Sequence, residues 1–221
     1  MNSNTLLTLT TNEIVKHYPE TASLFYHSNI NFYNVEPTKL SDVATKNLLE
    51  ELEKATEHKP SQTPNSLQTT DLVDFIYDNY HVTTRQYIQK ITDILSKLLA
   101  IHREHSNELK QVVNIWTIFA NEMEDHLKKE EQILFPLIKE YAKTKTNNLK
   151  EMIACPIAKM ESEHENHEKN LLELKKISQT LTSSNQGIAD FSICFYEIDQ
   201  LVQLTLTHVH IENNILFERM R

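Results

Sequence analysis

The segment HLKKEEQILF (126–135) returns near the C-terminus as HVHIENNILF (208–217), with His, Glu, Ile, Leu and Phe at matching positions. A His and a Glu four residues apart lie on one face of an α-helix, about 6 Å apart along its axis. The Ile-Leu-Phe that follows supplies an apolar wall beside them. The repeat therefore predicts two helices, each of which directs one imidazole and one carboxylate to the same side.

Long amphipathic helices are predicted around both segments, because apolar residues recur at helical spacing and polar stretches separate the regions. The expected helices cover residues 70–106, 109–142, 156–180 and 190–219, with turns near 107, near 148 and at SSNQG (183–187). Pro156 is expected to open the third helix, since the first helical turn tolerates a missing N–H. Four such helices joined by short turns predict an all-α fold, an antiparallel four-helix bundle.

A smaller unit is predicted ahead of the bundle. Short apolar patches within residues 1–55 indicate three or four short helices. Residues 56–69, TEHKPSQTPNSLQT, contain two prolines, five Ser or Thr and almost no apolar side chains, which is typical of a solvated linker. The predicted domains are therefore a small helical N-terminal domain (1–55), a linker (56–69) and the bundle (70–221).

The composition excludes several classes of function. The net charge is -9, and no segment is basic enough to follow a phosphate backbone, so nucleic acid is not an expected partner. Gly187 is the only glycine, which excludes Gly-rich phosphate-binding loops. Two cysteines are too few for a disulfide scaffold or an iron–sulfur site. No basic leader and no apolar run of about 18 residues is present, so we expect no membrane association and a cytoplasmic location.

Eleven histidines are unusual, because imidazole is a frequent metal ligand and proton carrier near neutral pH. Counting residues outward from the expected turns brings one histidine of each helix to a similar level, and two glutamates join them. The resulting candidate ligands are His81, His126, His164 and His208, with Glu130 and Glu212 as bridging carboxylates. His102 is left out, since a continuous helix would place it about 30 Å from His81.

Four neutral imidazoles and two carboxylates predict a pair of non-haem iron ions. The combined ligand charge of -2 is too small for a hard calcium site, but it suits two iron ions that share an oxo or hydroxo group. Each ion would keep one open position, where dioxygen or nitric oxide can bind. Taken singly, the His-Glu pairs are also compatible with contacts on an exposed helix surface. The segment ESEHENHE (161–168) is likewise compatible with a solvated acidic face. The joint pattern favours the metal site.

Three segments resemble the signature regions of a known family: HLKKEEQILFP (126–136), MESEHENH (160–167) and HVHIENNILF (208–217). They are similar to the di-iron iron–sulfur cluster repair proteins, the "repair of iron centres" family, which has a hemerythrin-like domain. IVKHYPETASLFYHSNINFY (14–33) resembles the small leading domain of that family. The resemblance implies the same six ligands, with Glu122 and Glu163 as buried acidic neighbours, and His102 aligns with a histidine common in the family.

The resemblance implies a protein that helps restore iron–sulfur clusters damaged by nitrosative or oxidative stress. It implies that iron is supplied to damaged iron–sulfur proteins or to scaffold proteins. A hemerythrin-like sensor or binder of dioxygen or nitric oxide, and a di-iron nitric oxide or peroxide reductase, stay open as alternatives, and so does a homodimer. The family normally carries a Cys-Cys-Gly-Gly turn in its leading domain, whereas Tyr33-Asn34-Val35-Glu36 follows Phe32 here, so thiol-dependent steps are in doubt.

Overall fold

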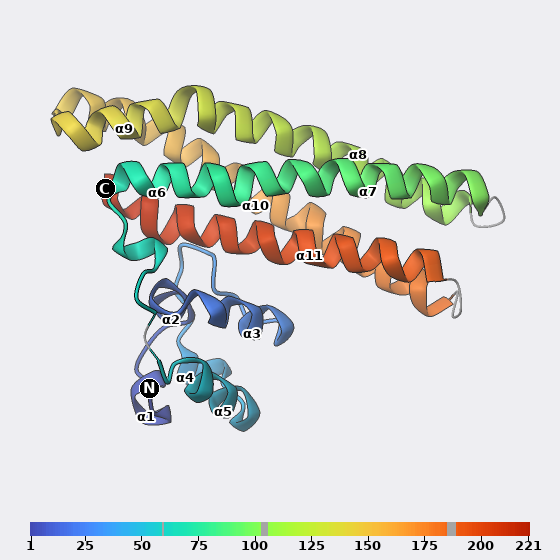
Figure 1. Cartoon of the computed structure of the whole chain (residues 1–221), viewed down its shortest axis with the longest axis horizontal. Helices are drawn as coiled ribbons and strands as arrows, with labels where there is room; N and C mark the ends of the chain where they lie inside the picture. Colours follow the sequence, from blue (N-terminus) through green and yellow to red (C-terminus); the bar gives the residue numbers. More distant parts are fainter. Residues whose placement is uncertain (59, 103–105, 185–188) are drawn as a thin grey trace. The chain divides into compact units, whose positions relative to one another are not determined.

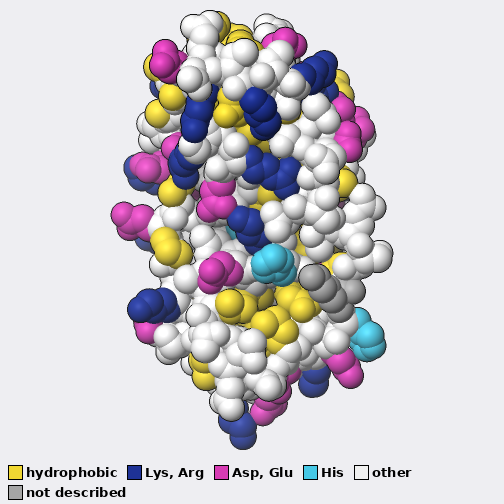
Figure 2. Space-filling model, turned by 90° about the vertical axis from the view of Figure 1, so that its left-hand side faces the viewer, with side chains coloured by type: hydrophobic (Ala, Val, Ile, Leu, Met, Phe, Trp, Pro, Cys, Tyr) yellow, Lys and Arg dark blue, Asp and Glu magenta, His cyan; other side chains and the backbone are white. Residues whose placement is uncertain are grey.

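The structure is a computed structural model that describes residues 1–58, 60–102, 106–184 and 189–221. Within these ranges the regular elements are all helical, and the β-structure consists of one isolated bridge between Thr10 and Lys39. The predicted all-α class is therefore confirmed. None of the helices in the described ranges combines the length and the low polarity that a bilayer-crossing segment needs. On the face shown in Figure 2, basic and acidic side chains are interspersed.

The chain divides into two compact units, and both contain parts of the long helices. The first unit comprises residues 1–76, 138–150 and 206–221, and the second comprises residues 77–137 and 151–205. This division groups residues by their contacts and does not test the predicted boundaries at 55 and 69, which stay a prediction.

The first unit begins with several short helices. They are α1 (Ser3–Leu6), α2 (Thr11–His17), α3 (Ala22–His27), α4 (Leu40–Val43), α5 (Lys46–Ala55) and α6 (Thr69–Ile76), with 3-10 turns at Pro19–Thr21 and Pro64–Ser66. Five α-helices precede the predicted linker where the sequence indicated three or four, because α1 and α4 have a single turn each and show no periodic pattern. The core of this part includes Leu6, Ile14, Phe25 and Leu52, all fully buried.

A capping box stabilises the start of α2. The hydroxyl of Thr10 accepts from the backbone N–H of Glu13, and the backbone N–H of Thr10 donates to the Glu13 carboxylate at 2.8 Å. The bond from the Thr10 backbone is the main cause that lowers the pKa of Glu13 below its ordinary value of 4.5. The hydrogen bond from the Thr10 hydroxyl lowers this pKa further. The ionised form of Glu13 is therefore the one that stabilises the fold.

We expect the stabilisation from Glu13 to be complete above pH 4.5 and to be lost as the pH falls through the lower pKa of the folded state. Glu13→Ala should thus lower the melting temperature at pH 7 and lower it much less near pH 2.5. Differential scanning calorimetry at the two pH values measures the difference, with the exposed Glu57→Ala as the control. A constant deficit at both pH values would contradict this account of the capping box.

The second unit is built from parts of four helical rods (Figure 1). The rods contain a π-helical turn at Tyr77–His81 followed by α7 (Val82–Ile101), α8 (Ser106–Lys129) followed by a π-helical turn at Glu130–Leu134 and α9 (Phe135–Thr144), α10 (Asn147–Ser184) and α11 (Ala189–Ile211). Side-chain contacts within the unit join them in a ring: Arg85–Glu124, Lys129–Glu163, Lys175–Asp199 and Lys90–Glu197. Each rod is thus bonded to two neighbours.

Neighbouring rods run in opposite directions where two contacts can be compared. The indole Nε1 of Trp116 donates to the hydroxyl of Thr92, and farther along α8 Glu124 meets Arg85. Residue numbers therefore rise along α8 as they fall along α7. The same order relates α8 to α10, because Lys129 pairs with Glu163 and Glu122 with Asn170.

The third long helix begins earlier than predicted. It starts at Asn147, and Pro156 lies inside it instead of opening it. A proline in a helix interior removes one backbone hydrogen bond, so we expected the helix to begin at Pro156. The buried residues Ile153, Ile157 and Met160 explain the difference, since they form one apolar stripe at i, i+4 and i+7 that passes through the proline.

The other helix ends differ in smaller ways. The first long helix ends at Ile101 where residue 106 was predicted, and the second extends from Ser106 to Thr144 where 109–142 was predicted. The turn expected near residue 148 lies at residues 145–146. The expected turn at Gly187 lies outside the described residues. The fourth helix begins at Ala189, becomes π-helical at Glu212–Leu216 and closes with a 3-10 turn at Glu218–Met220.

Candidate metal centre

All six predicted metal ligands are buried. Relative exposures lie between 0% and 3% for His81, His126, Glu130, His164, His208 and Glu212. Burial of imidazoles and carboxylates is costly unless a hydrogen bond, a charge or a metal ion compensates for the lost hydration. Six such groups on the long helices therefore need a common explanation.

In the second unit, Glu130 lies between two histidines. Its Oε2 is 3.4 Å from Nε2 of His81, and its Oε1 is 3.4 Å from Nε2 of His126. Nε2 of His126 also lies 3.2 Å from Nε2 of His164. A neutral imidazole carries one N–H, so two rings that face each other through Nε2 can share one proton or direct both lone pairs to a common point. A carboxylate with one oxygen toward each histidine suits a bridge between two metal ions.

The duplicated motif supplies a second His-Glu pair in the first unit, where Nε2 of His208 is 3.0 Å from Oε1 of Glu212. One possible ligand atom from each residue lies within 4.8 Å of the others in two groups of four that share both glutamates. These groups are His81, Glu130, His208 and Glu212, and His126, Glu130, His164 and Glu212.

This donor set fits a di-iron centre. Each group offers two imidazoles and two shared carboxylates, and mixed nitrogen and oxygen ligands of this kind suit iron. Two shared carboxylates are also what a pair of neighbouring ions needs for bridging. The clusters can therefore hold two non-haem iron ions, with room in the coordination of each for an oxo or hydroxo bridge.

Three of the six residues lie at π-helical turns. His81 ends the first of these turns, and Glu130 and Glu212 begin the other two. In both repeats the Glu carbonyl accepts a hydrogen bond from the N–H five residues later, from Phe135 to Glu130 and from Phe217 to Glu212. Single π-helical turns are less favourable than α-helix and occur frequently at functional sites. The repeated sequence thus encodes a repeated backbone geometry as well as a repeated His-Glu pair.

A carboxylate holds the outer nitrogen of His81. Nδ1 of His81 lies 2.8 Å from Oε1 of Glu131, and Arg85 donates to both Glu131 oxygens, from Nη1 at 2.7 Å and from Nη2 at 3.2 Å. Burial opposes ionisation of Glu131, but the bonds from Arg85 and His81 outweigh it and lower the pKa of this carboxyl. Because the carboxylate only accepts, Nδ1 of His81 carries the proton and Nε2 presents its lone pair inward.

The same arrangement recurs at His126. Its Nδ1 lies 3.1 Å from Oε2 of Glu163, and Lys129 and Lys159 pair with the other oxygen at 2.8 and 3.4 Å. The hydrogen bond from His126 is the largest cause that holds the pKa of Glu163 well below its usual range. Glu163 was predicted as a buried acidic neighbour of the centre; it contacts His126 as expected, but it is half-buried. Glu131, which sequence reasoning missed, has the equivalent position at His81.

We expect Glu131→Leu to weaken iron binding about 10- to 100-fold, because His81 loses the partner that fixes its tautomer and ring orientation. Competition with a chromogenic chelator measures the change. Glu131→Gln keeps an oxygen that accepts from Nδ1 and should lose less. Leucine at the neighbouring exposed Gln132 is the matched control. Equal iron affinity in Glu131→Leu and the wild type would show that this bond does not orient the ligand.

Two further residues lie outside both four-residue groups, one against the prediction and one in agreement with it. Glu122, predicted as a buried acidic neighbour, is exposed and accepts a hydrogen bond from Nδ2 of Asn170 at 3.0 Å. The prediction of burial is wrong: Glu122 lies on the same face of α8 as His126, but one helical turn earlier, where it lines a polar cavity. His102 caps the end of α7 and lies 3.4 Å from Asp190, and neither four-residue group contains it.

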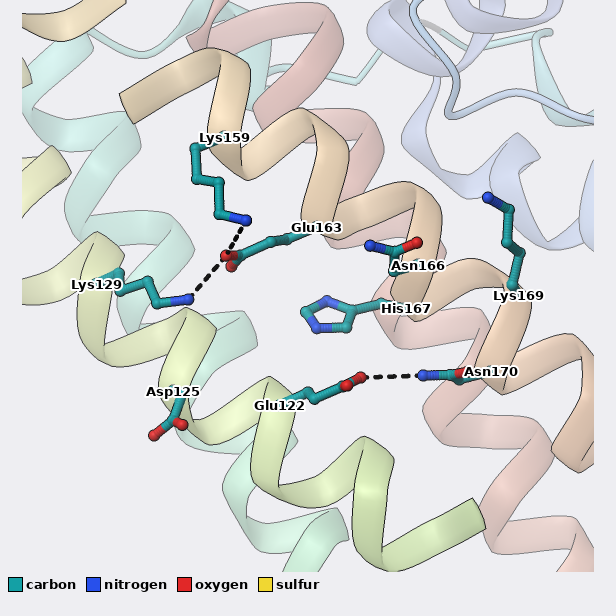
Figure 3. Close-up of a pocket in the computed structure, with 9 residues that line it drawn as sticks. All are labelled: Glu122, Asp125, Lys129, Lys159, Glu163, Asn166, His167, Lys169 and Asn170. Carbon is teal, nitrogen blue, oxygen red and sulfur yellow. Dashed lines mark hydrogen bonds and ion pairs between the residues drawn. The ribbon is translucent and has the colours of Figure 1, made fainter. Parts of the chain in front are cut away.

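A polar cavity of about 430 Å³ opens beside His126 in the second unit. Figure 3 shows Glu163 between Lys129 and Lys159 on one side of it, and the ring of His167 directed into it. His167 is 2% exposed, packs edge-to-face on His126 at 4.9 Å between ring centroids, and has a pKa lowered to about 3 chiefly by burial. Its sequence context, an acidic run, suggested a surface residue instead.

Comparison with known proteins finds one matching domain family and several relatives that share one name. Residues 72–220 match the family model described as the hemerythrin HHE cation binding domain. The chain is 25% identical over 213 residues to the "Iron-sulfur cluster repair protein YtfE" of Shigella boydii serotype 4, with 94% of each chain covered. It is 23% identical over 213 residues to the protein of the same name from Salmonella choleraesuis, again with 94% of each covered. A relative of the same name from Salmonella paratyphi B is 27% identical over 149 residues, which cover 67% of this chain and 64% of the relative.

Proposed function

Because the chain belongs to the family of hemerythrin HHE cation-binding domains, we propose that it is a di-iron protein that takes part in the repair of damaged iron–sulfur clusters. The observation that carries the proposal is the pair of buried four-residue groups that share Glu130 and Glu212. The relatives named for cluster repair support it, since two of them match over 94% of the chain. Iron–sulfur proteins damaged by nitrosative or oxidative stress are the proposed targets.

The six predicted residues are the proposed ligands. Glu130 and Glu212 would bridge the two ions, and the Nε2 atoms of the four histidines would complete the two sets. Glu131 and Glu163 keep the Nδ1 protons of His81 and His126 in place, so that both Nε2 atoms present lone pairs. Iron bound in this way supplies open coordination positions and one-electron chemistry.

We further propose that the protein supplies iron to the damaged cluster. Two shared carboxylates carry only two negative charges toward two iron ions, which favours release when an acceptor with more negative, thiolate ligands is present. The N-terminal module contains no cysteine, so a relay of iron through its thiols is not available. Transfer would proceed from the histidine and glutamate ligands directly to the acceptor.

A transfer assay tests this proposal. The iron-loaded protein is mixed with a cluster-free ferredoxin-type acceptor, a sulfide source and a chelator that captures free iron. We expect acceptor clusters to form faster than with an equal amount of chelated iron. Iron that stays on the protein while the acceptor remains empty would contradict iron supply, although the di-iron centre itself would stand.

A second function is favoured by the cavity beside His126. Glu163 and His167 line this cavity and both contact His126, so a small molecule in it would lie close to one ligand group. Binding or reduction of dioxygen, peroxide or nitric oxide fits this arrangement. Stopped-flow mixing with nitric oxide and a reductant separates the alternatives, since product formation indicates a reductase and a stable adduct indicates a sensor.

We also propose a cytoplasmic location and the domain division 1–55, 56–69 and 70–221. Cys155 and Cys194 are both free, in keeping with a reducing compartment. The proposed linker is not wholly free, because Arg219 donates to the carbonyls of Leu67 and Asn65 at 2.8 and 2.9 Å.

A further inference from the structure

The turn at residues 31–34 contains Tyr33 and Asn34, which stand where the resembled family carries its Cys-Cys pair, and hydrogen bonds define its geometry. Oδ1 of Asn31 accepts from the backbone N–H groups of Tyr33 and Asn34, both at 3.1 Å. The Asn31 carbonyl accepts from the hydroxyl of Thr11 in α2 at 2.6 Å. An Asn side chain that bonds backbone groups two and three residues later closes a turn without glycine. The 31–34 turn is therefore fixed to α2.

Two of these carbonyls are bonded to the last helix. Nδ1 of His210 donates to the Phe32 carbonyl at 2.8 Å, and Nδ2 of Asn214 donates to the Tyr33 carbonyl at 3.0 Å. A carbonyl only accepts, so Nδ1 of His210 must carry the proton. Phe32, His210 and Asn214 are 1%, 1% and 3% exposed. Loss of either bond would leave a buried carbonyl without its partner, which is more costly than loss of a bond at the surface.

The two bonds lie on either side of a proposed iron ligand. His210 is two residues before Glu212, and Asn214 is two residues after it, inside the π-helical turn Glu212–Leu216. Oδ1 of Asn214 also accepts from Nδ2 of Asn12 in α2 at 3.2 Å, so the N-terminal module contacts both ends of the Asn214 amide. A π-helical turn must be stabilised against the ordinary α-helical register. The bonds at 210 and 214 both act on the segment that contains Glu212 and its π-helical turn.

We propose that the 31–34 turn is a positioning element for Glu212, which holds the π-helical turn through His210 and Asn214 and so strengthens iron binding. The inference rests on the proposed metal centre and assigns the N-terminal module a role that needs no thiol. The module also contacts the C-terminal end away from Glu212, through an ion pair of 2.6 Å between Lys16 and Glu218.

Variants of the full-length protein test the proposal. His210→Leu removes the donor to Phe32, whereas His210→Asn keeps a donor nitrogen at the same number of bonds from Cα. Asn31→Ala loosens the turn from the side of the module and leaves the helix unchanged. Lys16→Ala is the matched control, since it removes a contact between the same two segments that does not flank Glu212. The readouts are the rate of iron capture by a chelator and the difference in melting temperature between iron-loaded and iron-free protein.

We expect His210→Leu and Asn31→Ala to release iron at least about 10-fold faster than the wild type and to show a smaller melting difference. His210→Asn and Lys16→Ala should behave like the wild type. If His210→Leu does not fold, Asn31→Ala and His210→Asn carry the comparison. Wild-type release rates in Asn31→Ala and folded His210→Leu would overturn the proposal, as would equal acceleration by Lys16→Ala. Absence of iron from the wild type would instead overturn the proposed metal centre.

Discussion

Glu130→Leu is expected to purify with fewer than two iron ions per chain. Glu130 is fully buried, its two oxygens face Nε2 of His81 and of His126, and it belongs to both four-residue groups. Loss of this carboxylate therefore affects both ions. Metal analysis by mass spectrometry, expressed per chain, measures the effect.

The same substitution should not destabilise the iron-free protein. Leucine is similar in size to glutamate and removes the cost of burying a carboxylate, and the histidines that face position 130 can stay neutral. Glu140→Leu is the matched control, because Glu140 is exposed on α9, which follows Glu130 along the same rod. Retention of two irons by Glu130→Leu would contradict the bridging role. Equal iron loss in Glu140→Leu would attribute the effect to general damage of the helix.

Removal of iron is expected to lower the melting temperature by about 10 °C. A ligand that binds only the folded state, at a free concentration a thousandfold above its Kd, stabilises by about 4 kcal/mol. For a chain of this size, each kcal/mol changes the melting temperature by about 2–4 °C. Without iron, the buried carboxylates of Glu130 and Glu212 lose the cations that the proposed centre supplies. Differential scanning calorimetry of loaded and chelator-treated protein measures the difference.

Magnesium is the control for this experiment. It prefers six oxygen ligands in octahedral geometry and is a poor match for imidazole nitrogens. Addition of Mg²⁺ to the iron-free protein should therefore change the melting temperature little. Equal melting temperatures with and without iron, or equal stabilisation by Mg²⁺, would contradict a centre built from these histidines and glutamates.

The sequence was sufficient to predict the fold class and the likeness to a di-iron family. The repeated His-Glu pair with its Ile-Leu-Phe, together with the scarcity of glycine, indicated long helices, and the structure and the family match confirm both conclusions. Counting from the turns selected six residues that make up both groups of candidate ligand atoms, because levels in a bundle depend mainly on helix rise, which is constant. Their roles as ligands stay a prediction.

The local backbone was harder to predict. Hydrophobic periodicity assumes about 3.6 residues per turn, and a π-helical turn adds one residue to one turn without a characteristic composition. The π-helical turns at Glu130 and Glu212 were therefore not predicted, although the repeat of His, Glu, Ile, Leu and Phe around them was visible. The helix start predicted at Pro156 was wrong. Burial of the apolar stripe of Ile153, Ile157 and Met160 outweighs the intrinsic cost of a proline inside the helix.

The supporting side chains depend on contacts between helices, which sequence spacing does not specify. Glu131 directly follows the predicted ligand Glu130, and nothing in its sequence position distinguishes it from a surface carboxylate. It nevertheless accepts a hydrogen bond from His81 on another rod. His167 lies in an acidic run and nevertheless packs on His126. His210 and Asn214 donate hydrogen bonds to the carbonyls of Phe32 and Tyr33, which are far away in the sequence. No local sequence pattern predicts these bonds.

The iron content and absorption spectrum of the wild-type protein test the central claim most directly. Protein from iron-supplied cells is expected to contain two iron ions per chain. It should show the visible absorption of oxo- or hydroxo-bridged iron, and this absorption should disappear when a chelator removes the metal. A colourless protein that contains no iron under any growth condition, and that takes up none when iron is added to the purified chain, would contradict the account.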